Sequence, residues 1–151
     1  MIAEILPLDR FEKIREDYKT FIPKPFKLSS IVSLEDDINW IIDQLPQKPK
    51  TLALLFSSSV HGWKVKDWIK ACKGKAMTIT IMKTTNGRVC GGYLHIAWKE
   101  AKCEYGSDPS AFLFTLDHRR KLTPTDPKEA VWFNLGNGNG PYFRCSLAVC
   151  G

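Results

Sequence analysis

The sequence predicts a sheet-dominated α+β domain, most simply a β-sandwich, and three observations lead to this fold class. Short apolar or alternating segments separated by turn residues fill the last two thirds of the chain, which is typical of antiparallel strands. Nearer the N-terminus, two segments have the apolar spacing of amphipathic helices. The length of 151 residues suits one domain, since single domains commonly hold about 100–200 residues.

Residues 1–28 are expected to form a helical lead-in or linker, and residues 29–151 the folded domain. Asp9 and Glu12 have the spacing of a capping box, which predicts a short helix from that point. Pro23 ends this helix, because proline lacks an N–H and favours extended backbone before it.

A second helix is predicted to begin at Ser33, whose hydroxyl would cap its first turn, and to end at Pro46. Acidic residues 35–37 suit the positive end of the helix dipole. The helix carries one apolar stripe for docking on a core: Leu34, Ile38, Ile41, Ile42 and Leu45. The next apolar run, residues 51–56, predicts a fully buried strand.

A serine turn at 57–59 precedes a third helix, predicted over residues 63–72 and ended by Gly74. One face of this helix is apolar: Val65, Trp68, Ile69 and Cys72. The other face is basic: Lys66, Lys70 and Lys73.

Asn86-Gly87 predicts a two-residue hairpin turn between strands at 77–85 and 88–94, because both residues tolerate positive φ. This turn would place Ile79 opposite Leu94. The pair Gly91-Gly92 indicates a bulge or the close approach of another element.

The remaining segments complete the sheets. We expect a polar loop at 98–109, a strand at 111–116, a basic turn at 119–121, a loop at 123–127, a strand at 129–135, a turn at 136–141 and a final strand at 142–149.

The net charge of +6 is unevenly distributed, with −1 over residues 1–50 and +7 over residues 51–151. A basic surface favours anionic partners without choosing among nucleic acid, acidic protein and anionic lipid. The five cysteines are odd in number and form no Cys-x-x-Cys pair, which favours reduced thiols in the cytoplasm. The longest strongly apolar run, residues 52–56, is far short of the roughly 20 residues of a membrane span.

Motifs for catalysis, metals or cofactors are weak. Cys90 and His95 differ by an odd number along a strand, so they should point to opposite faces. The serines beside His61 lack a Gly-x-Ser-x-Gly elbow, and the cysteine and histidine spacing matches no zinc site. The glycines at 136–140 precede a proline and a strand, so we expect a sheet connection and no phosphate loop. We therefore expect no catalytic residues, no metal and no cofactor.

Three runs of the sequence, taken in order, carry a resemblance to a known family: residues 54–63 (LLFSSSVHGW), residues 83–93 (KTTNGRVCGGY) followed by Trp98, and residues 107–114 (SDPSAFLF). Together with the helix that ends in Leu45-Pro46, this order resembles the TLDc domain, in the form common in single-celled eukaryotes. The resemblance covers roughly residues 29–143. Its motif residues are His61, Gly62, Trp63, Asn86, Gly87, Gly91, Gly92, Trp98, Phe112 and Phe114.

The resemblance implies a two-sheet antiparallel β-sandwich flanked by helices. The TLDc family has no established catalytic residue set. Its members are linked to oxidative stress resistance and to the vacuolar-type proton pump (V-ATPase), which they bind as modules that alter pump assembly or activity. Two features depart from the family pattern: Lys64 replaces a capping Ser or Thr, and the chain stops where a TLDc domain adds further strands. We therefore expect either a missing or a diverged C-terminal part.

These observations favour a cytoplasmic, non-enzymatic module that binds a protein partner. Its expected contact residues are basic: Lys66, Lys70, Lys73, Arg119, Arg120 and Lys121. Two alternatives stay open. One is a hydrolase or redox enzyme with a reactive thiol, and the other is a binder of anionic lipid or nucleic acid.

Overall fold

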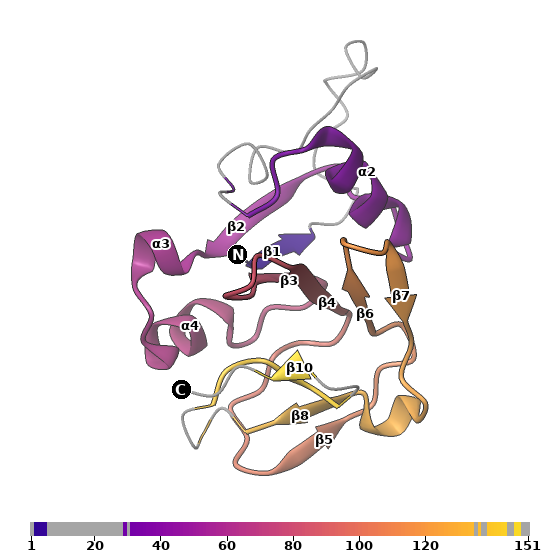
Figure 1. The fold of residues 1–151 in the computed structure, drawn as a ribbon. Helices are drawn as coiled ribbons and strands as arrows, with labels where there is room; N and C mark the ends of the chain where they lie inside the picture. The colour runs from indigo at the N-terminus through magenta and orange to yellow at the C-terminus, as the bar shows by residue number, and fades with distance from the viewer. Residues whose placement is uncertain are drawn as a thin grey trace.

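A computed structural model of the chain describes residues 2–5, 29, 31–134, 136, 139–144 and 147–148 (Figure 1). These residues form two antiparallel sheets with helices packed beside them, which confirms the predicted α+β sandwich. The helix expected after Asp9 lies outside the described residues.

The larger sheet has six strands in the order β2-β1-β3-β4-β6-β7. Their bounds are β1 Ile2–Ile5, β2 Leu52–Phe56, β3 Thr78–Lys83, β4 Val89–Leu94, β6 Phe112–Thr115 and β7 Arg120–Leu122. The smaller sheet has the order β10-β9-β8-β5. Its bounds are β5 Glu104–Gly106, β8 Val131–Phe133, β9 Tyr142–Phe143 and β10 Leu147–Ala148.

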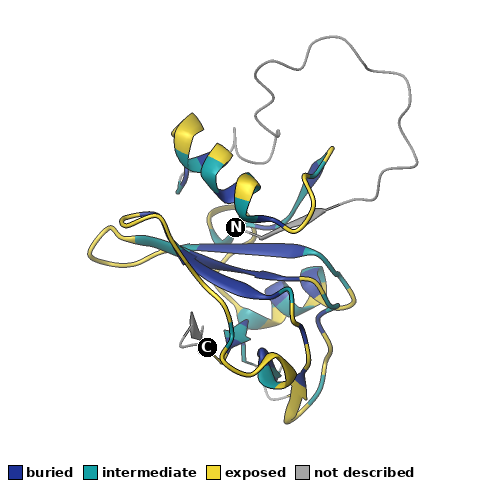
Figure 2. Ribbon diagram, turned by 90° about the vertical axis from the view of Figure 1, so that its right-hand side faces the viewer, coloured by how far each residue is buried: buried dark blue, intermediate teal, exposed yellow. Residues whose placement is uncertain are grey.

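The helices are α2 Glu35–Gln44, α3 Ser58–His61, α4 Val65–Cys72 and the 3-10 turn η2 Pro127–Glu129. The central strands of the larger sheet, β3, β4 and β6, are largely buried (Figure 2), and α2 covers one face of the sheet. The smaller sheet and α4 pack on the other face. Side chains alternate between the two cores: Ile79 and Ile81 of β3 pack under α2, while Leu94 and Leu113 face the smaller sheet.

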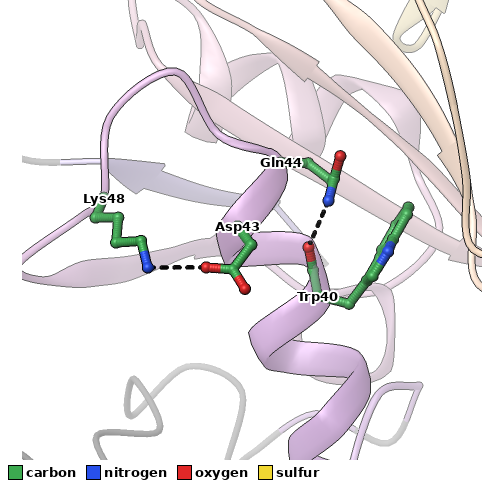
Figure 3. A network of polar contacts seen from close by, with 4 residues as sticks. All are labelled: Trp40, Asp43, Gln44 and Lys48. Carbon is green, nitrogen blue, oxygen red and sulfur yellow. Dashed lines mark hydrogen bonds and ion pairs between the residues drawn. The ribbon is translucent and has the colours of Figure 1, made fainter.

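Helix α2 docks largely as predicted. Ile38, Ile41 and Leu45 are buried, but Leu34 is 67% exposed because it is the N-cap residue and precedes the helical stripe. Ser33 is therefore not the N-cap, and no side chain caps this helix. At its C-terminal end, Gln44 Nε2 donates to the Trp40 carbonyl at 3.3 Å, and Lys48 pairs with Asp43 at 2.9 Å (Figure 3).

The predicted hairpin forms with a register shifted by one residue, so that Ile79 lies opposite Tyr93 instead of Leu94. The cause is the turn. Among its residues only Gly87 has positive φ (+84°), and the Thr84 N–H donates to the Arg88 carbonyl. The loop therefore holds three residues and ends in a left-handed glycine, because a two-residue type I′ turn would need positive φ at Asn86 as well.

Gly91 and Gly92 mark a close approach, one of the two predicted alternatives. A Cβ on Gly91 would lie 2.2 Å from the Thr80 carbonyl oxygen and 2.5 Å from the Phe114 ring. A Cβ on Gly92 would lie 2.8 Å from the Phe143 ring of the opposite sheet. The absence of side chains at these two positions lets aromatic rings pack on both faces of β4.

Several strand predictions need correction. Strand β2 is an edge strand with a half-buried centre, so it is not fully buried. The expected loop at 98–109 contains β5, and two residues of the expected basic turn, Arg120 and Lys121, belong to β7. The expected final strand at 142–149 is two short strands, β9 and β10, that pair with each other.

Strand β1 was not predicted and lies between β2 and β3, inside the larger sheet. Ile2–Ile5 therefore belong to the fold, although they stand in the segment expected to be a lead-in. The domain boundary at residue 28 stays a prediction.

Candidate functional site

A groove of about 560 Å³ opens between β2, β3 and the segment that carries α3 and α4. Its apolar lining includes Leu54 and Phe56 of β2 and Met82 of β3. Trp68 of α4 also lines the groove, and its ring makes an edge contact with Trp98 at a centroid distance of 5.2 Å. This mainly apolar hollow has a size typical of a binding site, since such sites hold roughly 300–1,000 Å³.

Two large apolar side chains on its wall are exposed: Val60 at 73% and Trp63 at 85%. Gly62 places them there. It has a φ of +88°, and its N–H donates to the Ser58 carbonyl at 3.0 Å, which ends α3 and redirects the chain. Because side chains rarely tolerate this φ, glycine suits the position.

His61 holds the same turn together. Its ring stacks on Phe56 with centroids 5.5 Å apart. Its Nδ1 lies 3.0 Å from the Ser57 backbone nitrogen and 3.1 Å from the Ser57 carbonyl oxygen. In the His61-Gly62-Trp63 motif, His61 and Gly62 therefore shape the turn, while Trp63 is exposed to solvent.

The charged residues that line the groove are Lys64 and Lys83, and no acidic residue of the described chain lines it. Lys66 and Lys70 add positive charge on the exposed side of α4. The charged side chains that line the groove are therefore both cationic, which favours anionic groups on whatever binds there.

Two buried polar atoms near the groove have no hydrogen-bond partner among the residues that the structure describes: Trp68 Nε1 and Thr80 Oγ1. Both residues line the groove, and both side chains are almost fully buried, with Trp68 5% and Thr80 3% exposed. Buried polar groups are normally paired, because leaving one unpaired costs roughly 1–3 kcal/mol.

The six basic residues predicted as contacts do not form one surface. Arg119, Arg120 and Lys121 lie at β7, the opposite edge of the larger sheet from β2, against which α4 packs. Three of the six have internal partners: Lys73 pairs with Glu100, Arg119 pairs with Asp37, and Lys121 donates to the Gln44 carbonyl at 2.8 Å.

Lys121 also lies over the Phe112 ring at 4.3 Å, so the basic turn fastens α2 to the sheet. The other three, Lys66, Lys70 and Arg120, are exposed and have no ion pair within the described residues.

The remaining motif residues build the fold. Trp98 is 1% exposed and lies between the two sheets and α4, and its Nε1 donates to Thr78 Oγ1 at 2.9 Å. Phe112 and Phe114 are buried under α2. Asn86 and Gly87 form the hairpin turn, where Thr84 Oγ1 bonds to the Asn86 side chain.

Asp108 is a structural residue that the sequence analysis missed. It is 1% exposed, and its carboxylate accepts the backbone N–H groups of His95 at 2.6 Å, Ile96 at 3.3 Å and Ser110 at 2.9 Å. The signal was its Asp-Pro context, which favours side-chain hydrogen bonds to nearby backbone in turns. The apolar groove left no comparable local signal.

The serine and cysteine candidates lack an activating arrangement. Ser57 and Ser59 hydroxyls bond to each other at 2.8 Å, while His61 bonds to the Ser57 backbone and to neither hydroxyl. Burial raises the pKa of the Cys72 thiol to about 12. Burial, and then the charge of Asp117, raises the pKa of Cys90. A nucleophilic thiol needs a lowered pKa.

Cys145 and Cys150 lie outside the described residues, while Cys103 is exposed. Within the described part of the chain, no three His, Cys, Asp or Glu side chains gather as a metal site. Over the same residues, no helix has the length and apolar character that crossing a membrane requires.

Comparison with known proteins gives a family match over residues 26–149, to the TLDc domain. Among curated proteins, the chain is 30% identical over 76 residues to TBC1 domain family member 24 of Xenopus laevis, covering 50% of this chain and 13% of that protein. It is 32% identical over 63 residues to MTOR-associated protein MEAK7 of Danio rerio, covering 42% of this chain and 14% of that protein.

The match to MEAK7 of Xenopus laevis is longer. It is 30% identical over 112 residues, which is 70% of this chain and 24% of that protein. The chain therefore spans a quarter or less of the length of these relatives, and the shared part is one domain.

Proposed function

The chain belongs to the TLDc domain family, and from this premise we propose that it is a protein-interaction module whose contact surface is the α3–α4 region. By family resemblance, we propose the vacuolar-type proton pump as its partner and oxidative stress resistance as the outcome. The cytoplasm is the proposed compartment, as the odd cysteine count favours. The name of the MEAK7 relatives, which describes association with MTOR, supports a regulatory role for the domain in general terms.

The exposed Trp63 carries this proposal. A tryptophan 85% exposed beside an apolar groove is unusual for a surface that stays in water. Tryptophan and arginine dominate the residues that supply binding energy in protein interfaces. Lys66 and Lys70 beside it are exposed, so they can steer an acidic partner toward the groove.

The test is co-elution of the purified chain with the soluble sector of the vacuolar proton pump, with the ATPase rate measured in the same samples. We expect Trp63→Ser to weaken binding by tenfold or more, because a central tryptophan commonly contributes about 2 kcal/mol or more. Lys66→Glu with Lys70→Glu should weaken binding and reduce its salt dependence. Lys48→Glu with Lys128→Glu is the matched control, since these exposed lysines do not line the groove.

Failure of a cooperatively melting wild-type chain to bind the pump would contradict the choice of partner. Equal binding by all variants would contradict the choice of surface. The lipid and nucleic-acid alternative predicts instead that affinity collapses with salt and does not depend on Trp63.

The thiol-enzyme alternative predicts one thiol that is alkylated fast and selectively at neutral pH. The raised pKa values of Cys72 and Cys90 oppose this role for those two residues. Slow alkylation of all five thiols would remove the alternative for the whole chain.

A further inference from the structure

We propose that the groove binds an acidic, amphipathic peptide segment of the partner, with an apolar side chain in the groove and flanking carboxylates on Lys64 and Lys83. This inference rests on the proposed function and specifies the chemistry of the partner at the same site. It does not depend on the identity of the partner.

The apolar part follows from the lining and the rim. The groove holds about 560 Å³, and apolar residues of β2 and β3 are part of its lining. Val60 and Trp63 extend this apolar surface outward, since they are 73% and 85% exposed. These exposed side chains at the rim would contact a ligand that extends beyond the groove, as a peptide chain does.

The acidic part follows from charge. Both charged residues that line the groove, Lys64 and Lys83, are lysines. Lys66 and Lys70 lie on the exposed side of α4. Carboxylates that flank the apolar anchor would therefore meet opposite charge on either side. A basic segment would meet repulsion there, and an uncharged one would gain neither effect.

The experiment selects peptides from a random 12-residue phage library on the immobilised full-length chain. We expect the selected peptides to be enriched in Asp and Glu around a bulky apolar residue. The best peptide should bind Lys64→Glu/Lys83→Glu about tenfold more weakly. It should bind the Lys48→Glu/Lys128→Glu control, which has the same change in net charge, as it binds the wild type.

Both variant pairs replace exposed side chains, so they should melt as the wild type does.

Three results would overturn the proposal: no enrichment above background, enrichment of basic or uncharged peptides, or equal binding to the groove variants and the control. Displacement of the peptide by a long-chain fatty acid at equal concentration would also overturn it, by assigning the groove to a lipid. Selection of acidic peptides by a chain that does not co-elute with the pump would keep this inference and reject the partner named above.

Discussion

Trp98 should be the side chain whose loss most weakens the contact between the two sheets. It is 1% exposed and makes edge contacts with Trp68 at 5.2 Å, Phe143 at 5.9 Å and Phe133 at 6.2 Å. Truncation of a buried tryptophan to alanine costs about 3–5 kcal/mol. Trp98→Ala would also leave the hydroxyl of Thr78 buried and unpaired, at a further cost of about 1 kcal/mol.

The sum approaches the whole stability of a small domain, which is about 5–15 kcal/mol. The quantitative test therefore uses milder changes in a double-mutant cycle. Trp98→Phe keeps a ring but leaves the Thr78 hydroxyl without a donor. Thr78→Val leaves the indole N–H without an acceptor. The double variant leaves neither group unpaired, so it should be less destabilised than the sum of the single variants by about 1–2 kcal/mol.

The assay is urea unfolding followed by circular dichroism, because tryptophan fluorescence changes with the substitution itself. The free energy of unfolding of each variant is obtained by linear extrapolation to zero urea. Additivity of the two single variants within about 0.5 kcal/mol would refute the reasoning, since it would mean that this hydrogen bond adds nothing.

Three further predictions concern the backbone, a buried carboxylate and alkaline pH. Gly91→Ala should cost about 3 kcal/mol, because its Cβ meets backbone 2.2 Å away, whereas Gly87→Ala meets no atom within 4 Å and should cost about 1 kcal/mol for its φ of +84°. Thermal melts compare the two, and equal losses would contradict the crowding argument. Asp108→Ala should cost about 3 kcal/mol, because three backbone N–H groups lose a charged acceptor; a loss under about 1 kcal/mol in urea unfolding would count against this role. Burial, and then Asp108, raises the pKa of Tyr93 from 10.0 to about 12, and burial raises the pKa of Cys72 from 9.0 to about 12. The unfolded chain ionises first, so stability should be full below about pH 9 and fall as the pH rises toward 12; Tyr93→Phe should flatten this fall in urea unfolding, and an unchanged pH profile would contradict it.

Much of the fold could be predicted from the sequence, because helices and turns are determined by residues that are close together along the chain. The spacing of Trp68 and Cys72 predicted which face of α4 is buried. Gly87 predicted the hairpin, although the register was wrong by one residue, because the number of left-handed residues in the turn decides the loop length. The double glycine at 91–92 predicted a bulge or a close approach, and the structure shows the close approach together with the rings that make it.

The candidate site could be predicted from the sequence only in part, because it is formed by residues that are distant in the sequence. The chain brings β2, α4 and β3 together into the groove, and no local pattern marks such a hollow. The basic residues show the same limit. Arg119 pairs with Asp37, which is 82 positions away in the sequence, and Lys121 donates to the Gln44 carbonyl, which is 77 positions away. Basic side chains that the sequence suggested as partner contacts are therefore bound within the fold.

What the sequence by itself determined is the class of fold, the family motifs, the helix faces and the main turns, since periodicity and turn chemistry act over a few residues. What only the tertiary structure decided is the place of β1 between β2 and β3, the pairing of the basic residues and the groove beside Trp63. A four-residue strand is marginal alone and becomes a strand only when two neighbours supply its hydrogen bonds. A surface likewise acquires its charge and shape only when distant segments have packed.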